Sequence, residues 1–128
     1  MNITVYLGAN EGNDPFFKEA VRELGAWIGT NGNTLVYGGS KSGLMGELAE
    51  SVLQAGGKVI GVEPSEAASM TAALKAGEPV ELPSANTIAD GTAVKEVGDK
   101  VVPYVKENVD DILLVDDDEL IGAFLDMV

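Results

Sequence analysis

Short apolar runs alternate with segments of helical periodicity in the first half of this chain. Three apolar runs of four or five residues predict strands, and two longer segments with apolar positions every three or four residues predict helices. The strands are expected at residues 3–7, 34–37 and 58–62, and the helices at 15–30 and 44–55. Apolar strands joined in this way by helices predict a parallel sheet covered on both faces.

Capping signals mark the ends of these two helices. Asp14 followed by Pro15 is typical of a helix start, and Gly56-Gly57 is typical of a helix end. The buried stripe of the first helix is predicted to be Phe17, Ala20, Val21, Leu24 and Ile28. The buried stripe of the second is predicted to be Leu44, Leu48, Val52 and Ala55.

The second half is less regular. It predicts a short helix at 67–76, a minor extended piece at 80–83, a helix after Asp99 and a strand at 111–115. Asp116 followed by Glu119 resembles a capping box, so we assign the acidic cluster 116–119 to capping rather than to a metal site. The final helix is predicted to bury Leu120, Ile121, Phe124, Leu125 and Val128.

This order of elements indicates the α/β class. We expect a three-layer, Rossmann-like or flavodoxin-like doubly wound parallel sheet of about four strands, in a single domain over residues 1–128. The expected strand order is 3-2-1-4, with 2-1-3-4 as the alternative. Both orders place the loops after the first two strands next to each other.

Composition narrows the function classes. The chain has a net charge of −13, which disfavours nucleic acid and anionic membrane surfaces as partners, and two thirds of its acidic residues follow residue 64. It has no cysteine and no histidine, so it forms no disulfide and carries no Ser-His-Asp triad, and we expect no metal site. No apolar run is long enough to span a bilayer and no secretory signal is visible, so the expected location is cytoplasmic.

Two glycine-rich loops follow the first two strands, where ligands of parallel sheets bind. The loop Gly38–Gly43 leads directly into a predicted helix, so its amides and hydroxyls are expected to face one anion, such as phosphate. The candidate binding residues are Gly8, Asn10, Gly39, Ser40, Lys41, Ser42 and Gly43. Glu47 is the nearest carboxylate and is expected to face solvent. We assign no catalytic residue.

The segments LGANEGNDPFFKEA, LVYGGSKSGLMGELAE and AGGKVIGVEP resemble the lonely-guy cytokinin phosphoribohydrolases, a lysine decarboxylase-like family, over residues 1–64. This resemblance implies release of a base from a nucleoside monophosphate on a Rossmann-like sheet, with the site shared across a dimer. It also implies that Gly8, Gly39, Ser40, Gly43 and Met45 border the nucleotide. The later PGGxGTxxE motif of that family is absent here.

Residues 59–128, from VIGVEPSEAASM to ILLVDDDEL, resemble the large domain of pyridoxal-phosphate-dependent threonine dehydratases. In that family a glycine-rich loop holds the cofactor phosphate, and YGGSKSG stands at the corresponding place here. The Schiff-base lysine and the serine that contacts the pyridine nitrogen have no counterpart in this sequence.

The two resemblances meet at a seam near residues 59–64. Because the catalytic motifs of both families are absent, we interpret the chain as an engineered or recombined chimeric scaffold that is not an enzyme and has no cofactor. The loop Gly38–Gly43 would keep a residual phosphate or anion site. The alternatives are a phosphoribohydrolase-like enzyme and a module that binds a nucleotide or the phosphate of pyridoxal phosphate. As partners we expect phosphate or a nucleotide, in a monomer or a homodimer.

Overall fold

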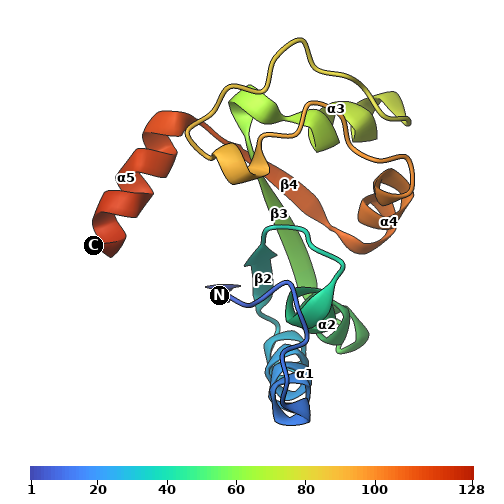
Figure 1. Ribbon diagram of the computed structural model, residues 1–128. Coiled ribbons are helices and arrows are strands. Elements are labelled where there is room, and N and C mark those ends of the chain that lie inside the picture. Colours follow the sequence, from blue (N-terminus) through green and yellow to red (C-terminus); the bar gives the residue numbers. More distant parts are fainter. The chain divides into compact units, whose positions relative to one another are not determined.

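The computed structural model describes residues 1–128, and Figure 1 labels its helices and all of its strands except the first. The chain forms two compact units. Unit 1 comprises Met1–Gly61 with Asn108–Asp111, and unit 2 comprises Val62–Glu107 with Ile112–Val128.

The strands are β1 (Asn2–Thr4), β2 (Thr34–Tyr37), β3 (Lys58–Pro64) and β4 (Asp111–Val115). They form one sheet in the order β1-β2-β3-β4, and the pairs β1/β2 and β2/β3 are parallel, with Ile3 opposite Leu35 and Leu35 opposite Val59. The predicted α/β class is therefore confirmed.

Both predicted strand orders are wrong. The three strands β1, β2 and β3 follow one another as in the Rossmann-like order, but β4 lies beside β3 rather than beside β1. Asp110, immediately before β4, explains this placement locally, because its amide donates to the Val59 carbonyl at 2.9 Å and its Oδ2 accepts from the Val59 amide at 2.8 Å.

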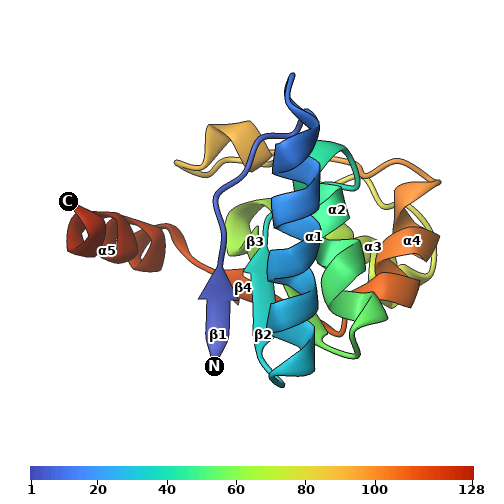
Figure 2. The ribbon, with the colours of Figure 1, turned by 90° about the horizontal axis from the view of Figure 1, so that it is seen from below.

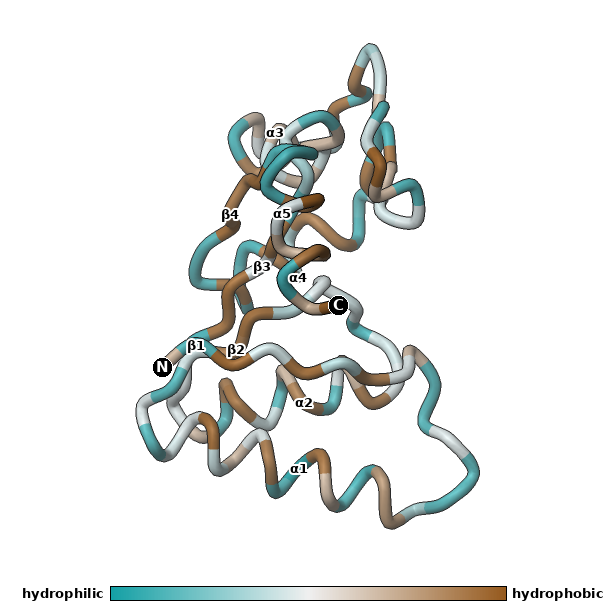
Figure 3. Tube along the Cα trace, turned by 90° about the vertical axis from the view of Figure 1, so that its left-hand side faces the viewer, coloured by the Kyte–Doolittle hydropathy of each residue, from teal (hydrophilic) through white to brown (hydrophobic).

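Two helices cover one face of the sheet in unit 1. They are α1 (Pro15–Thr30) and α2 (Gly43–Gln54), and Figures 2 and 3 show both on the same side of β1 and β2. Successive right-handed crossovers in one direction along a sheet produce this arrangement. The core between helices and sheet contains Val21, Ile28, Leu35, Tyr37, Leu48, Ala49, Val52 and Val59.

The local signals at the helix ends are confirmed. The Asp14 side chain accepts from the Phe16 amide at 2.9 Å, and Pro15 is the first residue of α1. Gly56 has a φ of +77° just after α2, as a helix-terminating glycine requires. Phe17 departs from the predicted stripe, because it is 47% exposed at the first turn of α1, before that helix reaches the core.

Unit 2 contains the helices α3 (Ser69–Ala76), α4 (Val101–Asn108) and α5 (Asp117–Met127), and 3₁₀ turns at Ser65–Ala67 and Asp90–Thr92. The last residue of α4, Asn108, is assigned to unit 1. No strand forms at 80–83. The capping box of α5 is confirmed, with the Asp116 side chain bonded to the Glu119 amide at 2.8 Å and the Glu119 side chain to the Asp116 amide at 3.0 Å.

The predicted burial of the α5 stripe is wrong, because no residue of α5 is buried and Phe124 and Leu125 are more than half exposed. A helical period identifies the apolar side of a helix without showing that another element covers it.

Throughout the chain, no helix combines the length and the hydropathy that a membrane span requires.

Candidate functional site

The two glycine-rich loops lie side by side at one edge of the sheet. The first follows β1 and the second follows β2, and these two strands are paired in parallel, so their carboxyl ends lie together. The Leu44 amide, in the first turn of α2, donates to the Asn10 carbonyl at 3.5 Å. The structure therefore brings Asn10, a predicted residue of the first loop, to the start of α2.

Gly43, at the start of α2, lies against the backbone of the first loop. Its φ is +62°, and a β-carbon built on it would lie 2.2 Å from the Ala9 carbonyl oxygen. A side chain at this position would occupy the space that the first loop fills. The contact therefore depends on glycine both for its backbone conformation and for its lack of a side chain.

The second loop is organised by its own serines. The Ser40 hydroxyl accepts from the Ser42 amide at 3.2 Å and donates to the Ser42 carbonyl at 3.4 Å. Gly39 has a φ of +85°, and no atom lies within 4 Å of the point where its β-carbon would be. There is thus open space in front of Gly39, while Ser40 shapes the loop from within.

The amino-terminal end of α2 has no side-chain cap. Ser42 is the N-cap residue but its side chain makes no capping bond, and the first turn contains no acidic residue. In contrast, α1 is capped by Asp14, and α5 has a capping box and three acidic residues in its first turn. A helix amino terminus carries a partial positive charge and amides without partners inside the helix, of which the Leu44 amide is bonded to the Asn10 carbonyl. The start of α2 is therefore suited to an anion.

Glu47 does not face solvent freely, contrary to the expectation from the sequence. Its carboxylate pairs with the Nε of Arg22 and lies 3.3 Å from the Nζ of Lys18, and its side chain is only 18% exposed. The Arg22 guanidinium, supported by the Lys18 ammonium, lowers the pKa of Glu47 from its ordinary value. A carboxyl group held ionised in this way is poorly placed to act as a general acid.

This pairing makes stability depend on pH. The pKa of Glu47 is lower in the folded chain than in the unfolded chain, so the unfolded chain takes up a proton first as the pH falls. The ion pair therefore stabilises the fold fully above the pKa that Glu47 has in the unfolded chain. This stabilisation is lost as the pH falls through the pKa that Glu47 has in the folded chain. We expect Glu47→Gln to cost about 0.2 to 1 kcal/mol of unfolding free energy at neutral pH. Its difference from the wild type should shrink as acid is added below about pH 4.5. Urea titrations at several pH values would measure this, and a difference that grows in acid would contradict the assignment.

Two interactions were missed at the level of sequence. The Glu63 carboxylate accepts from the Met70 amide at 2.7 Å, the Thr71 amide at 3.0 Å and the Thr71 hydroxyl at 2.8 Å, so it caps α3. The Lys18 ammonium lies 3.1 Å from Glu11 in the first loop. A carboxylate placed shortly before a helix was the available signal for the first, and no sequence signal points to the second.

Nowhere in the chain do three acidic side chains gather as a metal site.

Comparison with known proteins finds one family across nearly the whole chain. The family model described as pyridoxal-phosphate dependent enzyme matches residues 8–128. The biosynthetic L-threonine dehydratase of Pasteurella multocida is 44% identical over 70 residues, 55% of this chain and 14% of that protein. A probable cytokinin riboside 5'-monophosphate phosphoribohydrolase of Oryza sativa subsp. japonica is 45% identical over 62 residues, 48% of this chain and 28% of that protein. The double resemblance seen in the sequence is thus confirmed.

Solved structures agree with the family match. The threonine deaminase of T.th. aligns with a TM-score of 0.61 and 33% identity over 84% of this chain and 38% of that chain. Maize serine racemase aligns with a TM-score of 0.66 and 28% identity over 85% of this chain and 33% of that chain. The chain spans about one seventh of the Pasteurella multocida threonine dehydratase and about a third of these two solved chains.

These comparisons overturn the interpretation of the chain as an engineered scaffold without evolved activity, and with it the expectation that the chain is not an enzyme. One family model runs without interruption through the expected seam at 59–64. The chain belongs to the pyridoxal-phosphate dependent enzyme family.

Proposed function

We propose that the loop Gly38–Gly43 and the amino terminus of α2 bind the phosphate group of pyridoxal phosphate. The observation that carries this proposal is the uncapped start of α2 behind an open glycine loop. Phosphate would complete that helix end, with amides and the Ser42 hydroxyl as donors and Lys41 adding positive charge. The proposal replaces the expectation that the chain has no cofactor.

The residues present fit the phosphate end of the cofactor. The space before Gly39 is open, and the Ser42 hydroxyl is not used as a helix cap. Gly8 and Asn10 belong to the loop that lies against the start of α2, where the Asn10 carbonyl accepts from the Leu44 amide and Ala9 lies against Gly43. When bound, pyridoxal phosphate supplies an electron sink for reactions of amino acids.

The reaction class follows from the relatives and belongs to the proposal. The names of the matched proteins point to dehydration of L-threonine or a similar hydroxy amino acid. Because the chain spans a small part of those proteins, we assign to it the phosphate-binding part of such an enzyme. The residues that carry out chemistry on the substrate are not assigned.

Binding is best tested with pyridoxine 5′-phosphate, which has the phosphate of the cofactor but no aldehyde to react with surface lysines. We expect it to shift the amide resonances of Gly39 to Gly43, and we expect pyridoxine, which lacks the phosphate, to leave them unchanged. Inorganic phosphate should compete. Unshifted amides at millimolar pyridoxine 5′-phosphate would refute the proposal.

Gly39→Ala is expected to weaken this binding about tenfold, because its methyl group would enter the open space and alanine disfavours a φ of +85°. Titration monitored by the same amide resonances would give the two dissociation constants. Gly56→Ala is the matched control, because Gly56 has a φ of +77° and equally open surroundings at the other end of α2. Equal weakening by both substitutions would show that backbone strain, and not contact with the ligand, is responsible.

A nucleoside monophosphate is the second candidate ligand. The observation that favours it is the 45% identity to the rice phosphoribohydrolase over 62 residues. AMP would place its phosphate at the same helix end. Competition between AMP and pyridoxine 5′-phosphate, combined with an assay for release of adenine, separates the two, since tighter binding of AMP with base release would favour the second candidate.

A further inference from the structure

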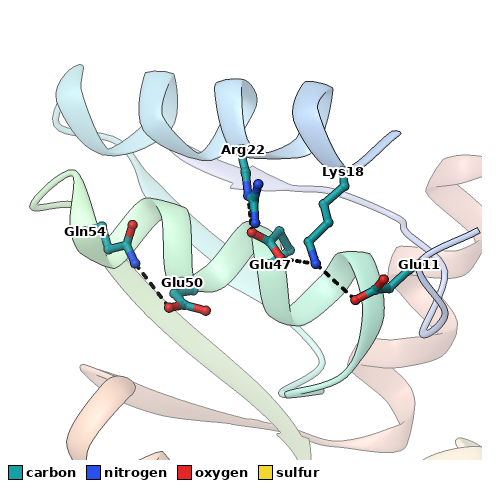
Figure 4. Close-up of polar contacts among 6 residues, drawn as sticks. All are labelled: Glu11, Lys18, Arg22, Glu47, Glu50 and Gln54. Atoms are coloured by element: carbon teal, nitrogen blue, oxygen red, sulfur yellow. Dashed lines mark hydrogen bonds and ion pairs between the residues drawn. The ribbon is translucent and has the colours of Figure 1, made fainter. Parts of the chain in front are cut away.

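A chain of ion pairs joins the first loop to both helices of unit 1. Figure 4 shows Lys18, on α1, reaching between two carboxylates, with its Nζ 3.1 Å from Oε1 of Glu11 and 3.3 Å from Oε2 of Glu47. Glu47, on α2, also accepts from Nε of Arg22. Lys18 is therefore the single side chain in this cluster that contacts both the loop and α2.

Glu11 lies next to the backbone that forms the proposed phosphate site. The two residues before it, Ala9 and Asn10, pack against Gly43 and accept the Leu44 amide. Glu47 lies one helical turn beyond Gly43. The loop is thus attached to α2 at two places, by its backbone at the helix start and by the Lys18 bridge one turn further along.

We propose that Lys18 is a positioning residue, which sets the affinity of the phosphate site by holding the loop 8–13 against α2. This inference rests on the proposed function. The bridge fixes the loop without touching the ligand. The pairing of the two helices does not depend on it, because Arg22 still pairs with Glu47 and the helices pack closely at Gly25 and Gly29.

A simple charge effect predicts a different pattern. If Lys18 acted only as a distant positive charge, Lys18→Met would weaken anion binding but Glu11→Gln, which removes a negative charge, would strengthen it. Positioning predicts that both substitutions weaken binding, since each breaks the same bridge. The sign of the Glu11→Gln effect therefore separates the two explanations.

The affinity test uses pyridoxine 5′-phosphate and the complete chain. We expect Lys18→Met and Glu11→Gln each to weaken binding about threefold to fivefold, the double variant to be no weaker than Lys18→Met alone, and Lys18→Arg to bind as the wild type does. Glu23→Gln is the control, because Glu23 is exposed on α1 and its substitution changes the charge as Glu11→Gln does. Unchanged or tighter binding by Glu11→Gln would overturn the inference.

A readout without ligand separates this inference from the proposed function. NMR relaxation of the free protein gives backbone order parameters for residues 9–12. We expect these order parameters to fall in Lys18→Met and Glu11→Gln, and to stay unchanged in Lys18→Arg and Glu23→Gln. Unaltered order parameters in both Lys18→Met and Glu11→Gln would overturn the positioning role even if the wild type binds the ligand. Failure of the wild type to bind, with the loop loosened as expected, would instead refute the proposed function.

Discussion

Gly43→Ala is expected to lower the free energy of unfolding by about 3 kcal/mol and to weaken phosphate binding more than tenfold. The methyl group would lie 2.2 Å from the Ala9 carbonyl oxygen, so the first loop must move away from α2. The left-handed φ of +62° adds a backbone cost of about 1 to 2 kcal/mol for any residue with a β-carbon. Urea unfolding followed by the fluorescence of Trp27, the single tryptophan, would measure the loss in unit 1.

Gly32→Ala supplies the control for the backbone term. Gly32 has a φ of +66° at the turn between α1 and β2, and no atom lies within 4 Å of the position of its β-carbon. We expect it to lose only the left-handed strain, about 1 to 2 kcal/mol, and to bind pyridoxine 5′-phosphate as the wild type does. Equal losses for the two variants would mean that the loop gives way at little cost, and that the contact of Gly43 with Ala9 does not organise the site.

Local signals in the sequence were sufficient for most element ends. The bounds of β2 and β4 match the predicted 34–37 and 111–115, and the caps at Asp14 and Asp116 form as predicted. Each of these features is decided by residues within three or four positions of one another. The ends of these elements could therefore be predicted from nearby residues alone.

The neighbour of β4 was beyond such local reasoning. An apolar strand of five residues pairs equally well at either edge of a parallel sheet, and the hydrogen bonds that join Asp110 to Val59 link positions 51 residues apart. The exposure of α5 was equally hidden, because a helical period reports an apolar face and not its partner.

The site was predictable in outline and not in detail. Adjacent parallel strands end at the same edge of the sheet, so the nearness of Gly8 and Asn10 to the loop Gly38–Gly43 followed from the fold class. The bridge through Lys18 required the register of α1 against α2, which no motif encodes. The missing cap of α2 was not readable from the sequence, because Ser42 is of a residue type that commonly caps helices, and only the structure shows that its side chain makes no capping bond.

Gly25→Ala is expected to destabilise unit 1 by about 2 kcal/mol although alanine is the better helix former. Gly25 is buried in the middle of α1 where that helix meets α2, and an added β-carbon would lie 2.6 Å from Cβ of Ser51 and 2.9 Å from the Leu48 carbonyl oxygen. Alanine gains about 0.5 to 1 kcal/mol in helix propensity, but overpacking of this kind costs about 1 to 3 kcal/mol or more where the neighbours are backbone. Urea unfolding monitored by Trp27 would report the net loss.

Gly122→Ala separates helix propensity from packing. Gly122 is also inside a helix, α5, but no atom lies within 4 Å of its added β-carbon. There we expect a gain of about 0.5 to 1 kcal/mol in local helix stability, visible as slower amide exchange within α5. Opposite signs for the two substitutions would show that the glycine of α1 is required by the close approach of α2. A gain in stability from both would mean that the helices of unit 1 separate to admit a methyl group at no cost, and that the positions of Lys18 and Glu47 relative to each other are not fixed by helix packing.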